Sequence, residues 1–170
     1  MKGIYLAAFK ANHPNFDIVY QDINGKRDIG GDMMEVDLTP YDFIIATPPC
    51  NYYSRANYRR ETSEYSQKTK HLLPSIIDKL IALGKPFIVE NVCNSRIFKE
   101  IGLYDKNCYI YIYGRHTYWS NVMMDLTGIP QRQDFKYGGR VIKYNDMNTK
   151  EHQGGFNVHQ VIEYWLNLIN

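Results

Sequence analysis

The clearest pattern of apolar and polar positions is a strand, a helix and a second strand in the middle of the chain. Residues 41–46 form an apolar run with two β-branched isoleucines, which favours a buried strand. Residues 72–83 repeat apolar side chains at helical spacing and end before Gly84, which favours an amphipathic helix. Residues 87–92 are apolar up to Glu90 and predict a second buried strand. We therefore expect two parallel neighbouring strands joined by a right-handed crossover.

This arrangement predicts where a thiol and a carboxyl group lie in the sheet. Pro48 and Pro49 offer no N–H to a sheet, so the first strand stops there and Cys50 is expected at its carboxyl end. Glu90 is expected at the same end of the second strand. Open α/β sheets bind their ligands at this edge, so the sequence predicts that Cys50 and Glu90 face one cleft. The alternative is that Cys50 is a buried thiol behind a proline turn.

Weaker patterns predict the remaining elements. We expect a short helix over 3–12, a strand over 17–22, a loop over 25–31, a helical turn over 96–101, strands over 108–113 and 139–144, and a terminal helix over 157–169. The apolar face of the terminal helix is predicted to carry Val158, Val161, Ile162, Trp165, Leu168 and Ile169.

Residues 51–70, directly after Cys50, have no apolar period and mix tyrosines with Arg55, Arg59 and Arg60. A polar segment of this length inside a compact domain is usually functional or disordered. We expect a lid that closes over a phosphate backbone. A solvated loop with ordinary surface charge is the alternative.

Composition narrows the classes of protein. The 170 residues suit a single domain over 1–170, and a net charge of +2 leaves nucleic-acid binding to local patches. Cys50, Cys93 and Cys108 form no metal or disulfide framework, which argues for a reducing compartment, the cytoplasm, and against a metal site. No apolar run is long enough to predict a membrane span.

Two motifs give the chain a family resemblance. Thr-Pro-Pro-Cys-Asn-Tyr-Tyr-Ser at 47–54, followed by Val-Glu-Asn-Val at 89–92, resembles the DNA cytosine-5 methyltransferases, and most closely the compact type common in bacteriophage genomes. The match continues in order through Gly31-Asp32-Met33, Gly114-Arg115-His116-Thr117-Tyr118-Trp119 and, imperfectly, Gly155-Phe156-Asn157-Val158. The resemblance implies an α/β fold: a Rossmann-like, mostly parallel sheet of a methyltransferase that uses S-adenosylmethionine.

The resemblance also implies a mechanism on DNA. Cys50 would add to C6 of a cytosine flipped out of the duplex, and Glu90 would hydrogen-bond or protonate N3. Arg115 would hold the base carbonyl or Glu90. A surface ion pair is the alternative role for Arg115. The implied DNA contacts are Ser54, Arg55, Arg59 and Arg60.

The implied S-adenosylmethionine site draws on scattered residues. Asp22 would bind the ribose hydroxyls, Asp32 the adenine amino group, and Pro48 would lie beside the methyl donor. Met33 and Asn157 complete the expected set. Turn or helix capping is the alternative for Asp22, Asp32 and Asn157. His116, His152 and His159 show no metal spacing and receive no predicted role.

The chain departs from the family at its start. The expected first strand and glycine-rich turn have no counterpart before the helix predicted at 3–12, so the sheet is expected to be truncated at its N-terminus. A second polypeptide that supplies the strand, a chain that starts downstream, or a decayed relative would each explain this. The segment expected to read DNA, about 117–150, is also short. The alternative function is a catalytically inactive remnant that binds nucleic acid or protein. An amino-group methyltransferase ranks last, because Glu-Asn-Val has no place in its mechanism.

Overall fold

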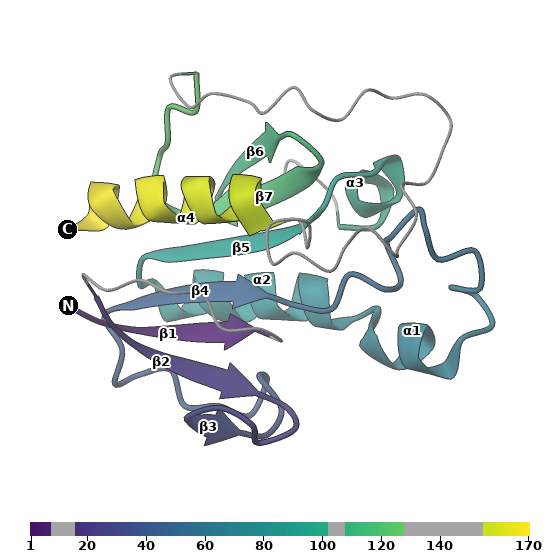
Figure 1. Ribbon diagram of the computed structural model, residues 1–170, viewed down its shortest axis with the longest axis horizontal. Coiled ribbons are helices and arrows are strands. Elements are labelled where there is room, and N and C mark those ends of the chain that lie inside the picture. Colours follow the sequence, from purple (N-terminus) through teal and green to yellow (C-terminus); the bar gives the residue numbers. More distant parts are fainter. Residues whose placement is uncertain (8–15, 102–107, 128–154) are drawn as a thin grey trace.

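The computed structural model describes residues 1–7, 16–101, 108–127 and 155–170 (Figure 1). The strands and helices are β1 (Lys2–Ala7), β2 (Asp17–Asp22), β3 (Ile29–Gly30), β4 (Phe43–Thr47), α1 (Glu64–Thr69), α2 (Leu72–Leu83), β5 (Phe87–Val92), α3 (Ser95–Ile101), β6 (Tyr109–Tyr113), β7 (His116–Ser120) and α4 (Gly155–Ile169).

Within this part of the chain the strands form one sheet in the order β3-β2-β1-β4-β5-β7-β6. The strands from β3 to β5 in that order are parallel, whereas β7 is antiparallel to both β5 and β6. The order reverses direction between β1 and β4, which is the switch point at which doubly wound α/β sheets bind ligands. The predicted α/β fold with a mostly parallel sheet is confirmed, and it is compatible with a Rossmann-like fold.

The central strand, helix and strand follow the prediction closely. β4 and β5 are parallel neighbours, with Ala46 paired to Val89. Between them, α2 ends at Gly84, whose φ of 72° is left-handed and whose N–H reaches the carbonyls of Leu80 and Ile81. Glycine adopts this conformation without strain, which explains why the helix stops there.

Helices cover both faces of the sheet (Figure 1). On one face, α2 and α3 pack through Leu73, Ile76, Ile77, Leu80, Ile97 and Ile101 against Ile4, Leu6, Ile44, Ala46 and Val89. On the other face, α4 packs through Val161, Ile162, Trp165 and Leu166 against Tyr5, Phe43, Ile45, Ile88 and Tyr118. The two sets of strand residues alternate along each strand, as the pleat of a sheet requires.

The predicted helix over 3–12 is wrong in its described part, because residues 2–7 form β1. This strand lies at the centre of the sheet between β2 and β4, and Ile4, Tyr5 and Leu6 are fully buried. A strand buried on both faces reads as a continuous apolar run, which periodicity alone does not separate from a short helix. The described sheet therefore contains a central first strand, which the sequence analysis expected to be missing. Residues 8–15, where the expected turn would follow, lie outside the described residues.

The hairpin of β6 and β7 also differs from expectation. β7 lies between β5 and β6, and its residues from Thr117 to Ser120 are buried. The expected DNA-reading segment at 117–150 therefore begins inside a buried strand. Its part beyond residue 127, with the strand predicted at 139–144, lies outside the described residues.

The terminal helix is confirmed, with two differences. α4 begins at Gly155, so Asn157 lies within the helix and is not its N-cap. Leu168, predicted on the apolar face, is 44% exposed, whereas Leu166 is buried. Nε1 of Trp165 donates a hydrogen bond to Oγ of Ser120 at 2.9 Å, which joins the helix to β7.

None of the helices that the structure describes is both long and apolar enough to cross a lipid bilayer.

Candidate functional site

Cys50 and Glu90 lie close together at the carboxyl edge of the sheet. Cys50 follows β4 by three residues and is partly buried, and Glu90 lies in the neighbouring strand β5. Burial raises the pKa of the Cys50 thiol, and the negative charge of Glu90 raises it further. The two residues thus share the predicted edge of the sheet, and this environment favours the thiol of Cys50 over the thiolate.

Asn91 fixes the backbone that leads to Cys50. Its Nδ2 donates a hydrogen bond to the carbonyl of Pro48 at 3.0 Å, and its Oδ1 accepts one from the N–H of Val92 at 2.9 Å. The Asn91 side chain is buried. A proline turn offers no N–H for the sheet ladder, so this side chain connects the end of β4 to β5 where backbone bonds do not.

Glu90 contacts a histidine that the sequence analysis left without a role. Nδ1 of His116 lies 2.5 Å from Oε1 of Glu90, and the two side chains are 17% and 12% exposed. β7 runs antiparallel to β5, so its first residue lies at the carboxyl end of β5. Glu90 is opposite Tyr118 and therefore diagonal to His116 on the same face of the sheet. No pattern local to residue 116 signals this contact.

Tyrosine and threonine hydroxyls surround Glu90 on the face that α4 covers. Tyr5 and Tyr118 belong to the buried cluster on that face, and the Tyr5 hydroxyl interacts with Thr47. Burial and the charge of Glu90 raise the pKa of both phenols. The Tyr118 hydroxyl has no hydrogen-bond partner among the residues that the structure describes. The site is thus a largely buried polar group within an apolar face.

Arg115 is the third predicted catalytic residue, and its role stays a prediction. Arg115 lies in the turn between β6 and β7, not on a strand, and it is exposed. Gly114 has a φ of 60°, and the carbonyl of Arg115 accepts a hydrogen bond from the N–H of Cys93 at 2.8 Å. The hairpin turn therefore places Arg115 one residue before the first position of β7, and His116 is the residue in contact with Glu90.

The two acids predicted to bind the cofactor each cap a turn. Asp22 ends β2 and is buried, and its Oδ1 accepts a hydrogen bond from the N–H of Asn24 at 2.6 Å. Asp32 is exposed, and its Oδ1 accepts one from the N–H of Met34 at 2.9 Å. These are the capping alternatives for both residues. An ionised carboxylate has four acceptor sites, so each retains capacity for a ligand.

The other members of the predicted cofactor set are Pro48, Met33 and Asn157. Pro48 is buried at the end of β4, next to the switch point. Met33 is half-buried and packs against the core on the α2 face. Asn157 lies in the first turn of α4.

The predicted DNA-binding residues lie on an ordered segment between β4 and α2. Tyr52 and Tyr53, at the start of this segment, are buried. Nδ2 of Asn57 donates hydrogen bonds to the carbonyl of Asn51 and to Oγ of Ser66, both at 2.9 Å. These hydrogen bonds connect parts of the segment to one another, and the segment includes the helix α1. No apolar periodicity in the sequence predicts these hydrogen bonds, because the side chains involved are mostly polar.

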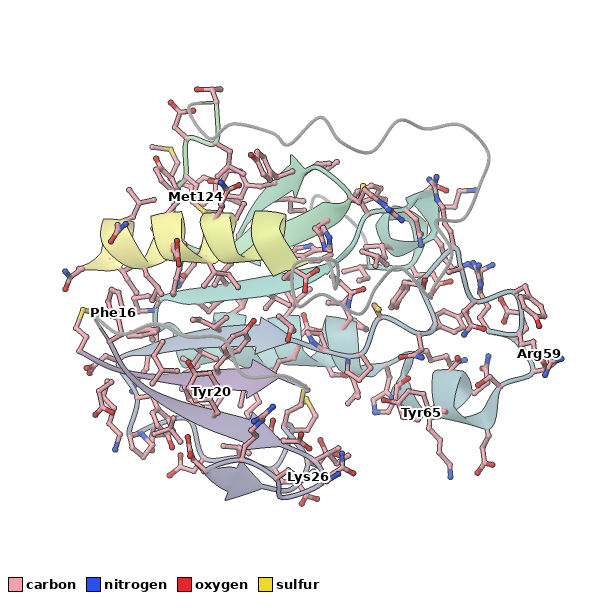
Figure 2. The ribbon with its side chains drawn as sticks, in the orientation of Figure 1. Phe16, Tyr20, Lys26, Arg59, Tyr65 and Met124 are labelled. Atoms are coloured by element: carbon pink, nitrogen blue, oxygen red, sulfur yellow. The ribbon has the colours of Figure 1, made fainter. Side chains whose placement is uncertain are left out.

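The arginines of this segment differ in their exposure to solvent. Arg55 and Arg59 are exposed, whereas Arg60 is half-buried and its Nε donates to the carbonyl of Asn57 at 2.9 Å. The guanidinium of Arg59 lies 5.4 Å from the ring centre of Tyr58, which is 82% exposed. Figure 2 shows Arg59 at the outer tip of the segment, away from the sheet. Ser54 is half-buried.

The described residues contain no cluster of three histidine, cysteine or acidic side chains that could hold a metal ion. No protein-family model matches the chain, and no curated protein matches it significantly.

Proposed function

We propose that the chain is a DNA cytosine-5 methyltransferase that acts through a covalent adduct between Cys50 and a flipped-out cytosine. The observation that carries the proposal is the position of Cys50 and Glu90 at the carboxyl edge of a doubly wound sheet, where β4 and β5 are parallel neighbours. A nucleophile and a proton donor at one ligand-binding edge are what this reaction requires.

In the proposed mechanism, Sγ of Cys50 adds to C6 of cytosine and forms a carbon–sulfur bond. Glu90 hydrogen-bonds or protonates N3 and so stabilises the charge that develops on the ring. C5 becomes nucleophilic and would form a bond to the methyl group that bound S-adenosylmethionine supplies, as the bond from that methyl group to the sulfonium sulfur breaks and the thioether leaves. Loss of the C5 proton then restores the double bond and expels the Cys50 thiolate.

The residues around the switch point fit the proposed cofactor. Asp22 ends the strand beside β1, where doubly wound folds present an acid to ribose hydroxyls. Asp32 would accept from the adenine amino group, and Pro48 and Met33 offer apolar contact. We propose that the exposed Arg55 and Arg59 contact DNA phosphates as the segment carrying them covers the flipped base.

Trapping on DNA tests the proposal. The full chain is incubated with S-adenosylmethionine and duplex DNA that contains 5-fluorocytosine, because fluorine at C5 cannot leave as a proton does. We expect a covalent complex that survives denaturing electrophoresis for the wild type and for Cys93→Ala, and none for Cys50→Ala.

The absence of any adduct with the wild type would refute the catalytic proposal. The raised pKa of Cys50 gives the inactive alternative a specific basis, since a thiol is a weak nucleophile. A protein that shifts DNA in a native gel but traps none would be a nucleic-acid-binding remnant. Calorimetry with S-adenosylmethionine separates the two further, because an active enzyme must bind it.

A further inference from the structure

The Glu90 carboxyl group pairs with a basic side chain from a neighbouring strand. Its Oε1 contacts Nδ1 of His116 at 2.5 Å, and both side chains are mostly buried. An ionised carboxylate only accepts hydrogen bonds, so Nδ1 of the imidazole carries the hydrogen and donates it. Such a charge-assisted bond is short and among the stronger ones in proteins.

Three further ionisable neighbours of Glu90 are weak acids. Its charge acts on Cys50, Tyr5 and Tyr118, and it raises the pKa of each. A thiol and two phenols held in their neutral forms do not balance a carboxylate. His116 is the basic side chain in contact with it, and it comes from β7, a different strand from the one that carries Glu90.

We infer that His116 is a positioning residue for Glu90. This inference rests on the proposed function. The Nδ1–H of His116 binds Oε1 and fixes the plane of the carboxyl group, so that Oε2 is free to carry the proton that N3 of the cytosine, itself an acceptor, receives. His116 acts through Glu90 and not on the substrate.

Kinetics of trapping on 5-fluorocytosine DNA test the role. We expect His116→Ala to lower the rate of adduct formation at saturating DNA roughly 100-fold, the cost of a misplaced catalytic group, with the DNA concentration for half-maximal rate unchanged. His116→Asn should restore most of the rate, because its amide N–H lies near the position of Nδ1. His71→Ala, an exposed histidine at the start of α2, is the matched control and should match the wild type.

The same assay can overturn the inference. It is wrong if His116→Ala traps at the wild-type rate, or if Arg115→Ala loses the rate while His116→Ala does not. If His116→Asn is as slow as His116→Ala while both remain folded by thermal unfolding, His116 relays a proton and is not merely a positioning residue.

A measurement without DNA tests the pairing of His116 with Glu90 separately from the proposed methyltransferase function. In protein labelled with ¹⁵N-histidine, the signal missing from His116→Ala identifies His116. We expect a protonated Nδ1 with a strongly downfield proton that moves upfield in Glu90→Gln. An unprotonated Nδ1, or no response to Glu90→Gln, contradicts the pairing. A wild type that shows this signal but forms no adduct refutes the methyltransferase and leaves the pair without a catalytic role.

Discussion

At Cys50, burial and a neighbouring charge act in the same direction. Both raise the pKa of the thiol, and the charge is that of Glu90. A nucleophilic cysteine normally lies near positive groups that lower its pKa. Here the pairing of Glu90 with His116 moderates the negative charge beside the thiol, and bound DNA or cofactor would change it again. Burial therefore lowers the reactivity of Cys50 most, and the charge of Glu90 lowers it further.

Replacing Glu90 should make Cys50 more reactive. In Glu90→Gln the neighbouring charge is gone, so the pKa of Cys50 falls and more thiolate is present at a given pH. We expect alkylation of Cys50 by iodoacetamide at neutral pH to become severalfold faster, as measured by mass spectrometry of its peptide. Cys93 in the same sample is the internal reference, and Glu100→Gln is the matched control at a different acid. An unchanged or slower reaction of Cys50 in Glu90→Gln contradicts this coupling.

At the scale of elements, β1 depends on a close contact with β4. A Cβ placed on Gly3 would lie 2.2 Å from ring atoms of Phe43, to which Gly3 is paired in register. Phe43 is itself fixed by α4, because its ring packs against Trp165 with 5.9 Å between ring centres. The glycine thus allows an aromatic ring to lie across the central strand.

We expect Gly3→Ala to lower the free energy of unfolding by about 1–3 kcal/mol, the usual cost of overpacking a core. The measurement is urea unfolding followed by tryptophan fluorescence. Phe43→Leu should cost less in the Gly3→Ala background than in the wild type, because the smaller side chain relieves the clash. Additive costs in this double-mutant cycle would show that Gly3 and Phe43 do not compete for space.

The buried Asn91 connects the segment after β4 to β5, and its replacement should lower the stability of the protein. Asn91→Ala leaves the Pro48 carbonyl and the Val92 N–H without their side-chain partners. We expect a loss of about 1–3 kcal/mol of unfolding free energy, the cost of buried unsatisfied polar groups. Asn167→Ala, exposed on α4, is the control and should leave stability unchanged. Equal stabilities of the two variants would argue against the bridge.

At the scale of the molecule, buried phenols tie stability to pH. Burial, with smaller contributions from nearby groups, raises the pKa of Tyr5 and Tyr118, and it raises that of Tyr53 to about 12. The unfolded chain releases these protons near pH 10, whereas the folded protein holds them to higher pH. The stability linked to them is complete below the unfolded pKa and is lost as pH rises through the folded pKa.

The free energy of unfolding should therefore fall steadily above about pH 10. Urea unfolding at intervals from neutral to strongly alkaline pH measures this. Tyr118→Phe should reduce the slope, whereas Tyr58→Phe, which removes an 82% exposed phenol, should leave it unchanged. A stability that is flat or rises with alkaline pH, or equal slopes in the two variants, would contradict the burial of these hydroxyls.

The local sequence pattern was sufficient to predict an element where its apolar face repeats over several turns or where a proline or glycine ends it. The helix of residues 72–83 with its glycine cap, both strands beside it and the convergence of Cys50 with Glu90 follow from such signals. It failed at β1, where burial on both faces removes the alternation that distinguishes a strand from a helix. The error at 3–12 then produced a second one, the truncated sheet.

The sequence by itself determined the fold class and the placement of Cys50 and Glu90 at the carboxyl edge of neighbouring strands, because period, proline and the crossover rule act within short stretches of chain. Only the tertiary structure decided which residue contacts Glu90. That depends on β7 running antiparallel beside β5, a pairing between segments 26 residues apart that brings His116 to the site and leaves Arg115 in the turn. Long-range register is a property of the whole sheet, and no short segment carries it.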